Sequence, residues 1–198
     1  MVEPGCPATA ALPRSFYRRD PREVAPALLG QTLVRGGRAG RVVEVEAYCG
    51  SEDPGSHAYR GRTARNATMF GPPGHLYVYF TYGMHWCANA VCGDEGTGWA
   101  VLLRALAPVG GMDEMRAARP AARRERDLCS GPAKLCQAFG IDRSMDGADL
   151  VSGSLGIRIC RGARVPAGAV VQTTRVGLSA GAEHPWRWYL AGEHVSRR

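Results

Sequence analysis

The amino-acid sequence predicts one compact domain of the α/β class, of the α+β type, with a β-sheet at its centre and helices at its periphery. Three observations lead to this prediction. The chain has 198 residues, which suits one domain with a substantial core. Runs of alternating or continuous apolar residues are separated by Gly-rich turns, as in strands joined by short connections. Only a few segments carry helix start and stop signals.

The first elements are a helix and two strands. Asp20 can cap a helix that has Pro21 in its first turn and Glu23 as the partner in a capping box, and Gly30 ends it. Strands are expected at 31–35 and 41–48, around a Gly-Gly turn. Before them, residues 1–13 are expected to be a disordered lead, so that residues 14–198 form the domain.

A long loop and a hairpin follow. Residues 49–75 are rich in Gly, Pro and Ser, and a loop of this length in a compact domain is usually functional. A short helix is expected inside it, around residues 63–69. The next apolar residues predict two strands within 76–91 that meet in a tight turn at Tyr82-Gly83. Residues 92–98 are then expected to form a turn before a strand at 99–106.

The remaining elements are two helices and several short strands. Helices are expected at 111–119 and 131–139. Ser130 can cap the second helix, and Gly140 ends it. Residues 155–195 are expected to form short strands separated by turns.

Charge and composition narrow the functional classes. The formal charge of +7 favours a polyanionic partner such as nucleic acid, although a basic surface alone would explain it about as well. The chain contains 24 Arg and one Lys, Lys134, which suggests a general Arg bias. No apolar run approaches the roughly 20 residues of a membrane helix, and no secretory signal is visible. We therefore expect a cytoplasmic protein without a membrane partner.

The cysteines and histidines give no indication of a metal or another cofactor. Seven cysteines occur without a CxxC pair, which predicts mostly buried, reduced thiols. The five histidines lack the paired spacing of zinc sites. We expect neither a metal nor an organic cofactor.

The segment RVVEVEAYCG, residues 41–50, places acidic residues inside a predicted strand. Side chains alternate along a strand, so Glu44, Glu46 and Tyr48 share one face. A pair of carboxylates about 6.5–7 Å apart fits glycosidic chemistry. Exposure to solvent or an ion pair with an Arg explains such a pattern more often than a catalytic role does. The pattern alone therefore leaves both explanations open.

The Tyr-rich hairpin is the second candidate feature. Tyr77 and Tyr79 share a strand face, where aromatic residues most often belong to the core. Tyr82 falls at the predicted turn, where burial in the core is not expected. An exposed aromatic side chain at a hairpin tip can insert into a stack of bases.

Two polar residues interrupt apolar strands, and a polar helix start follows them. Asn89 can bond to a neighbouring backbone group or read the edge of a base. Arg104 needs a buried partner, for which Glu44 or Glu46 are candidates. Ser130 and Lys134 stand at a helix N-terminus, where an anion could bind or where a simple cap would suffice.

Several of these segments together resemble the alkyladenine (3-methyladenine) DNA glycosylase family. The resemblance is carried by VVEVEAYCGSEDPGSHAYRGRTARNATMFGPPGHLYVYFTYGMHWCANAV, and further by VLLRALAP, LCSGPAKLCQAFGI and RVGLSAGAEHPWRWYL. These motifs occur in order and cover residues 14–197. The resemblance implies an α/β fold on a mixed, largely antiparallel sheet, and an enzyme that excises damaged purines from double-stranded DNA without a metal.

The resemblance also implies roles for individual residues. Glu46 would activate the attacking water, with Arg104 beside it. The base would lie in a pocket of Tyr48, His57, Tyr79 and Asn89, while Tyr82 would fill the gap in the DNA stack. For the DNA backbone we expect contacts from Arg62, Arg65, Ser130 and Lys134. The enzyme is expected to be a monofunctional monomer that starts base excision repair, in the nucleoid if the source is bacterial.

Only one carboxylate is needed at the sugar, so we expect Glu44 to serve as an ion-pair partner, with Arg104 as a candidate. Two other functions stay open at this point. A non-catalytic sensor of damaged DNA would use the same aromatic tip and basic surface. An enzyme of free nucleosides fits the exposed Tyr82 and the positive charge less well. The preferred lesion is not determined by the sequence.

Overall fold

The structure is a computed structural model that describes residues 10–166 and 168–196. Its centre is an eight-stranded sheet with the order β3-β4-β5-β2-β1-β6, to which β8 adds by pairing with β2, and β7 by pairing with β8. All of these pairings are antiparallel. The predicted α+β fold on a largely antiparallel sheet is therefore confirmed.

The strands are β1 (Thr32–Arg35), β2 (Arg38–Cys49), β3 (Leu76–Thr81), β4 (His85–Cys92), β5 (Trp99–Gly110), β6 (Ile157–Cys160), β7 (Val170–Thr173) and β8 (Arg187–Leu190). The α-helices are α1 (Arg14–Tyr17), α2 (Pro21–Leu28), α3 (Met112–Ala118) and α4 (Pro132–Phe139). Short 3-10 helices are η2 (Gly50–Glu52), η3 (Ala67–Phe70), η4 (Glu125–Asp127), η5 (Arg143–Met145) and η6 (Ser154–Gly156).

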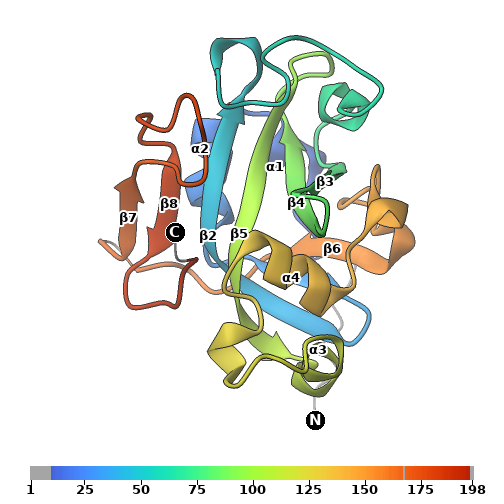
Figure 1. Cartoon of the computed structure of the whole chain (residues 1–198), viewed down its shortest axis with the longest axis vertical. Helices are drawn as coiled ribbons and strands as arrows, with labels where there is room; N and C mark the ends of the chain where they lie inside the picture. The colour runs from blue at the N-terminus through green and yellow to red at the C-terminus, as the bar shows by residue number, and fades with distance from the viewer. Residues whose placement is uncertain (1–9, 167, 197–198) are drawn as a thin grey trace.

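Helices lie on both sides of the sheet. In the view of Figure 1, α1 and α2 lie behind β2 and β5, while α4 lies in front of them. Buried side chains such as Leu28 of α2 and Phe139 of α4 join the main hydrophobic core on the two sides. Both faces of the central strands are thus covered, so a charged residue within β2 must find its partners inside the protein.

Local signals place most elements correctly. Asp20 caps α2 by accepting a hydrogen bond of 2.7 Å from the backbone N–H of Arg22. The predicted loop 49–75 contains η2 and η3, the second of which overlaps the short helix expected there. Strands β2 and β5 are longer than predicted because their outer ends also pair with each other, as at Ala39 and Gly110.

The predicted cap of α4 is wrong. The residue at the N-cap position is Gly131, and Ser130 makes no capping bond. Its hydroxyl instead donates to the carbonyl of Asp127 at 3.4 Å and accepts from Lys134 Nζ at 3.2 Å. Pro132 still begins the helix, and Gly140, with φ of 65°, ends it as expected.

The predicted N-terminal lead, residues 1–13, lies mostly outside the described residues. At its described end, Leu12 is buried and its N–H donates to the carbonyl of Ile159 at 2.9 Å. Ala11 forms an isolated bridge to Cys160. These residues extend the edge of the sheet beside β6.

Most of the described cysteines match the expectation of buried thiols. Free and buried thiols occur at Cys49, Cys87, Cys92, Cys129 and Cys136. Cys160 is disulfide-bonded, so the expectation of a reduced thiol is wrong at that position.

Candidate functional site

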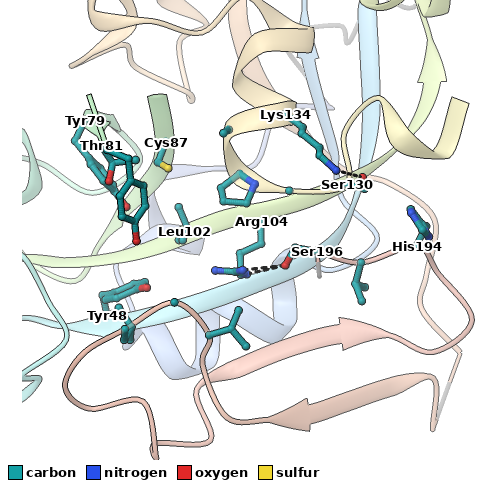
Figure 2. Close-up of a pocket in the computed structure, with 18 of the residues that line it drawn as sticks. Tyr48, Tyr79, Thr81, Cys87, Leu102, Arg104, Ser130, Lys134, His194 and Ser196 are labelled. Atoms are coloured by element: carbon teal, nitrogen blue, oxygen red, sulfur yellow. Dashed lines mark hydrogen bonds between the residues drawn. The ribbon is translucent and has the colours of Figure 1, made fainter. Parts of the chain in front are cut away.

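A groove of about 660 Å³ opens on the α4 side of the sheet, between the β3–β4 hairpin, the start of α4 and residues 176–178 and 194–196. Figure 2 shows Arg104 at its centre, with Tyr48 and Tyr79 on one side and Ser130, Lys134 and His194 on the other. A narrow slot of about 40 Å³ continues from the groove beyond Tyr48 and Tyr79.

The predicted site residues largely converge on this groove. Those that line it are Tyr48, His57, Tyr79, Tyr82, Arg104, Ser130 and Lys134, and Asn89 lines the slot. Glu46 lies buried directly behind Tyr48 and Arg104, to both of which it is hydrogen-bonded. Arg62 and Arg65 lie on the loop outside the two cavities.

Arg104 bridges the two glutamates of β2. Its Nε donates to Glu44 Oε1 and its Nη1 to Glu46 Oε2, each at 3.0 Å. Both carboxylates are fully buried. Burial opposes the charge on Arg104, but Glu46 and Glu44 together raise its pKa above the usual value. The predicted shared face of the glutamates and the predicted pairing of Glu44 with Arg104 are both confirmed.

The hydrogen-bond partners distinguish the two carboxylates. An ionised carboxylate has about four lone-pair sites. Among the described residues, Glu44 accepts four hydrogen bonds, from Arg104, Arg187 and the N–H and hydroxyl of Ser196. Glu46 accepts three, from Arg104, Tyr48 and the N–H of Val176. Glu44 is thus held by two cations, Arg104 and Arg187, and by Ser196. Glu46 instead pairs with one cation, and within the described part of the chain its Oε1 accepts only from Val176, so this oxygen can accept a further donor.

Tyr48 connects Glu46 to the open groove. Its hydroxyl donates to Glu46 Oε2 at 2.9 Å. Burial, and then the neighbouring charge of Glu46, raise the pKa of Tyr48 well above its ordinary value. The phenol consequently stays protonated, donates to the carboxylate, and leaves its ring as one wall of the groove.

Aromatic rings form the opposite wall. The ring of His57 meets Tyr79 edge-on at 4.4 Å, and Tyr79 stacks on Tyr77 at 5.5 Å. His57 Nδ1 lies 3.1 Å from the hydroxyl of Tyr77. Burial of the ring by surrounding protein atoms and the charge of Arg65 lower the pKa of His57, although its outer edge is exposed. His57 is therefore a neutral imidazole at pH 7.

Asn89 closes the slot. Its side-chain nitrogen donates to the carbonyl of Tyr77 at 3.1 Å, across the β3–β4 ladder. This is the structural bond that the sequence left open as one alternative. Because the bond fixes the amide nitrogen, the amide oxygen is the group that can accept a hydrogen bond from another molecule.

Tyr82 stands at the tip of the β3–β4 hairpin. It is 79% exposed, as predicted, and adopts a left-handed backbone with φ of 51°. Met84 beside it is 69% exposed. An exposed apolar tip at the rim of a groove is typical of a surface that contacts another molecule.

The residues predicted to contact phosphates fall into two groups. Ser130 and Lys134 lie at the groove wall, joined by the hydrogen bond drawn in Figure 2. Arg65 instead donates to the carbonyl of Phe80 at 3.0 Å and ties the loop to the hairpin. Arg62 is exposed on the same loop.

Residues of the site network that the sequence interpretation missed include Asp53, Arg175 and Ser196. Arg175 and Asp53 form a fully buried ion pair behind Tyr48. Ser196 accepts from Arg104 at 2.8 Å, a bond drawn in Figure 2. Their partners lie 92 to 122 residues away in sequence, so no local pattern could have indicated them.

The described part of the chain has neither a metal-binding cluster nor a membrane-spanning helix. It contains no group of three or more His, Cys, Asp or Glu side chains arranged to hold a metal ion. No helix within residues 10–166 and 168–196 has the length and apolar character needed to cross a bilayer.

Known proteins show extensive similarity to this chain. The family model described as Methylpurine-DNA glycosylase (MPG) matches residues 15–194. A Burkholderia lata protein named "Putative 3-methyladenine DNA glycosylase" is 55% identical over 184 residues, which cover 92% of this chain and 89% of that protein. Proteins of the same name from Streptomyces avermitilis and Carboxydothermus hydrogenoformans are 50% and 49% identical, over 93% and 94% of this chain and 89% and 99% of theirs.

Proposed function

The chain belongs to the methylpurine-DNA glycosylase family, and from this membership we propose that it flips alkylated or deaminated purines out of double-stranded DNA and hydrolyses their N-glycosidic bonds with Glu46 as general base. As a member it is a DNA-3-methyladenine glycosylase type hydrolase that acts in DNA repair. What we propose beyond this membership is the role of each site residue, the extrusion of the nucleotide, the duplex substrate and the range of bases excised.

Glu46 is suited to hold the attacking water. Its remaining lone-pair site can accept a hydrogen bond from a water molecule, and Tyr48 and Arg104 hold the carboxylate in place. As the bond to the base breaks, the sugar develops oxocarbenium character, which the carboxylate stabilises. The water oxygen then bonds to the sugar carbon, and its proton passes to Glu46.

The charge of the base decides what else is required. A purine alkylated on a ring nitrogen is a cation and leaves as a neutral molecule, so it needs no proton. A deaminated purine such as hypoxanthine is neutral, so the proton lost by the water must end on the departing base. The proposal includes deaminated purines, for which the proton taken up by Glu46 has to be passed on to the departing base.

The aromatic walls provide the binding site for the extruded base. Tyr48 on one side and His57 with Tyr79 on the other enclose the passage from the groove into the slot. Stacking of a base on an aromatic ring is worth roughly 1–3 kcal/mol. The amide oxygen of Asn89 at the end of the slot can accept from a base edge.

Tyr82 completes the scheme from the DNA side. Flipping a nucleotide costs a few kcal/mol, least for damaged and poorly paired bases. The exposed ring at the hairpin tip can occupy the space that the nucleotide leaves, which offsets this cost. Lys134, Ser130, Arg62 and Arg65 are the proposed contacts to the phosphates, with Arg65 also anchoring its loop.

The proposed site is built from a single chain, which supports action as a monomer. We also propose that the enzyme is monofunctional, since Lys134 is the only lysine of the chain and its ammonium group is hydrogen-bonded to Ser130. The proposed place of action is the DNA of the cytoplasm.

The observation that carries the proposal is the carboxylate of Glu46, which is hydrogen-bonded to Tyr48 and Arg104, two residues that line the groove. The test is single-turnover excision from duplexes that carry one hypoxanthine or one ethenoadenine, with wild type and Glu46→Gln in parallel. The wild type should leave alkali-labile abasic sites. Glu46→Gln should bind the same duplexes but cleave about 10²–10⁴-fold more slowly, the usual effect of losing a general base.

An undamaged duplex of the same sequence is the control for binding that does not depend on the lesion. If wild type excises a lesion and Glu46→Gln does so at the same rate, the assignment of Glu46 is wrong. If wild type excises alkylated bases but leaves hypoxanthine intact, the extension to deaminated purines is wrong.

A further inference from the structure

Arg175 occupies the back of the Tyr48 ring. The centre of its guanidinium lies 4.8 Å from the centroid of Tyr48 and 5.0 Å from that of Trp186, so the cation is enclosed between two rings. The residue is only 2% exposed. Tyr48 lines both the groove and the slot, whereas Arg175 lines neither. The cation therefore faces the side of Tyr48 that is turned away from the cavities.

Four hydrogen bonds fix the guanidinium in this position. Two of them, each of 2.6 Å, join it to the two oxygens of Asp53. The other two go to the carbonyls of Ala47, at 3.0 Å, and Gly181, at 2.7 Å. Ala47 is the residue between Glu46 and Tyr48 on β2. A cation that is held this firmly keeps a constant distance from the ring.

The charge of Arg175 acts on Tyr48 electrostatically. Burial and Glu46 raise the pKa of Tyr48, and Arg175 opposes them. A cation over one face of an aromatic ring is attracted by its π electrons. When one face already interacts with a cation, the other face offers less negative charge, so it attracts a second cation less strongly than a free ring would.

Damaged purines fall into two charge classes, and the weaker attraction of the Tyr48 ring for a second cation affects only one of them. Bases alkylated on a ring nitrogen are cations, whereas hypoxanthine and ethenoadenine are neutral. We propose that Arg175 is a specificity-determining residue, whose cation behind Tyr48 lowers the preference of the pocket for cationic bases and so admits neutral ones. The inference rests on the proposed function, in which Tyr48 stacks on the extruded base.

Asp53 provides a second charge with the opposite effect. Its carboxylate pairs with the side of the guanidinium that carries Nη1 and Nη2 and partly neutralises it. Replacing Asp53 with Asn leaves the cation without this counter-charge, which should disfavour cationic bases further. A double variant with Arg175→Gln and Asp53→Asn removes the cation closest to the ring, which should favour the binding of cationic bases. Changes of the preference for cationic bases in opposite directions in the two variants cannot arise from a loss of packing alone.

The experiment measures binding without cleavage, in the Glu46→Gln background. Dissociation constants are determined for duplexes with one 7-methylguanine, one hypoxanthine or no lesion, and selectivity is the dissociation constant for hypoxanthine divided by that for 7-methylguanine. We expect Asp53→Asn to lower this selectivity about two- to five-fold, and Arg175→Gln with Asp53→Asn to raise it about two- to five-fold, the range of single cation–π interactions.

The matched control is Arg14→Gln with Asp149→Asn, a partly buried ion pair outside both cavities. It should lower stability and leave the selectivity unchanged. Selectivity that stays constant in both test variants, or moves in the same direction in both, overturns the inference. If the double variant does not fold, the direction of the change in Asp53→Asn decides.

Excision by the unmodified protein separates this inference from the proposed function. If wild type releases neither lesion, the proposed function fails. If wild type releases both lesions and the selectivity does not respond, the proposed function stands and only the role of Arg175 is wrong.

Discussion

Replacement of Glu44 by Gln tests whether the two carboxylates of β2 have different tasks. Glu44 lies between two cations, with its Oε1 at 3.0 Å from Arg104 Nε and at 2.7 Å from Arg187 Nε. It also accepts two hydrogen bonds from Ser196. Glutamine has no charge to balance the cations, and its amide nitrogen would face donors.

The magnitude follows from this burial. Removing one partner of a buried ion pair costs about 3–5 kcal/mol. In a chain of this size, 1 kcal/mol shifts the melting temperature by about 2–4 °C, so the expected decrease is about 6–20 °C. Glu46→Gln should be less destabilising, because Arg104 and Arg187 then both keep Glu44 as their partner, whereas Glu44→Gln takes this carboxylate away from Arg187 as well.

The assay combines thermal unfolding with single-turnover excision at a temperature where both variants are folded. Glu44→Gln should be the less stable variant but retain excision within about ten-fold of wild type, whereas Glu46→Gln should lose about 10²–10⁴-fold. If folded Glu44→Gln lost as much activity as Glu46→Gln, or melted at the wild-type temperature, the division of tasks argued from the partners of the two carboxylates would be refuted.

Two further predictions concern contact with DNA. Tyr82→Ala should weaken binding of a lesion duplex about 5- to 150-fold, because roughly 1–3 kcal/mol of stacking is lost. It should change the free energy of unfolding by no more than about 0.5 kcal/mol, since the ring is 79% exposed. Fluorescence anisotropy measures the binding and urea unfolding measures the stability, with Val109→Ala as an exposed apolar control outside the groove. Equal binding by Tyr82→Ala and wild type would contradict the insertion of Tyr82 into the DNA stack. Lys134→Gln should reduce the slope of log affinity against log salt by about one and weaken damaged and undamaged duplexes alike, as expected for a phosphate contact. Arg161→Gln, at the end of β6, is its control, and an unchanged slope for Lys134→Gln would remove that contact from the proposal.

Much of the site could be predicted from the sequence because it depends on local geometry. The alternation of side chains along one strand is enough to place Glu44, Glu46 and Tyr48 on the same face. A Gly at the turn after a short apolar strand is enough to place Tyr82 at an exposed tip. The motif resemblance added the family, which the comparisons confirm.

The predicted helix cap at Ser130 failed because other nearby groups bond to its hydroxyl. Ser130 has the residue type of a helix cap, but its hydroxyl is engaged by Asp127 and Lys134. Arg65 belongs to a basic loop and bonds to the backbone of β3 at Phe80, a contact that the sequence does not display; its contact with DNA stays a prediction. The sequence shows which residues are polar, but not which of the available groups each side chain bonds to in the folded chain.

The sequence by itself determined the class of fold, the family and the set of residues around the groove, because strand alternation, turn chemistry and motif order are properties of neighbouring residues. Only the tertiary structure decided which glutamate bonds to Tyr48 and which one lies between two cations, and that a buried Arg175–Asp53 pair lies behind Tyr48. The physical reason is that a buried charge must be balanced wherever the fold brings an opposite charge to it. For Asp53 that partner is 122 residues away along the chain.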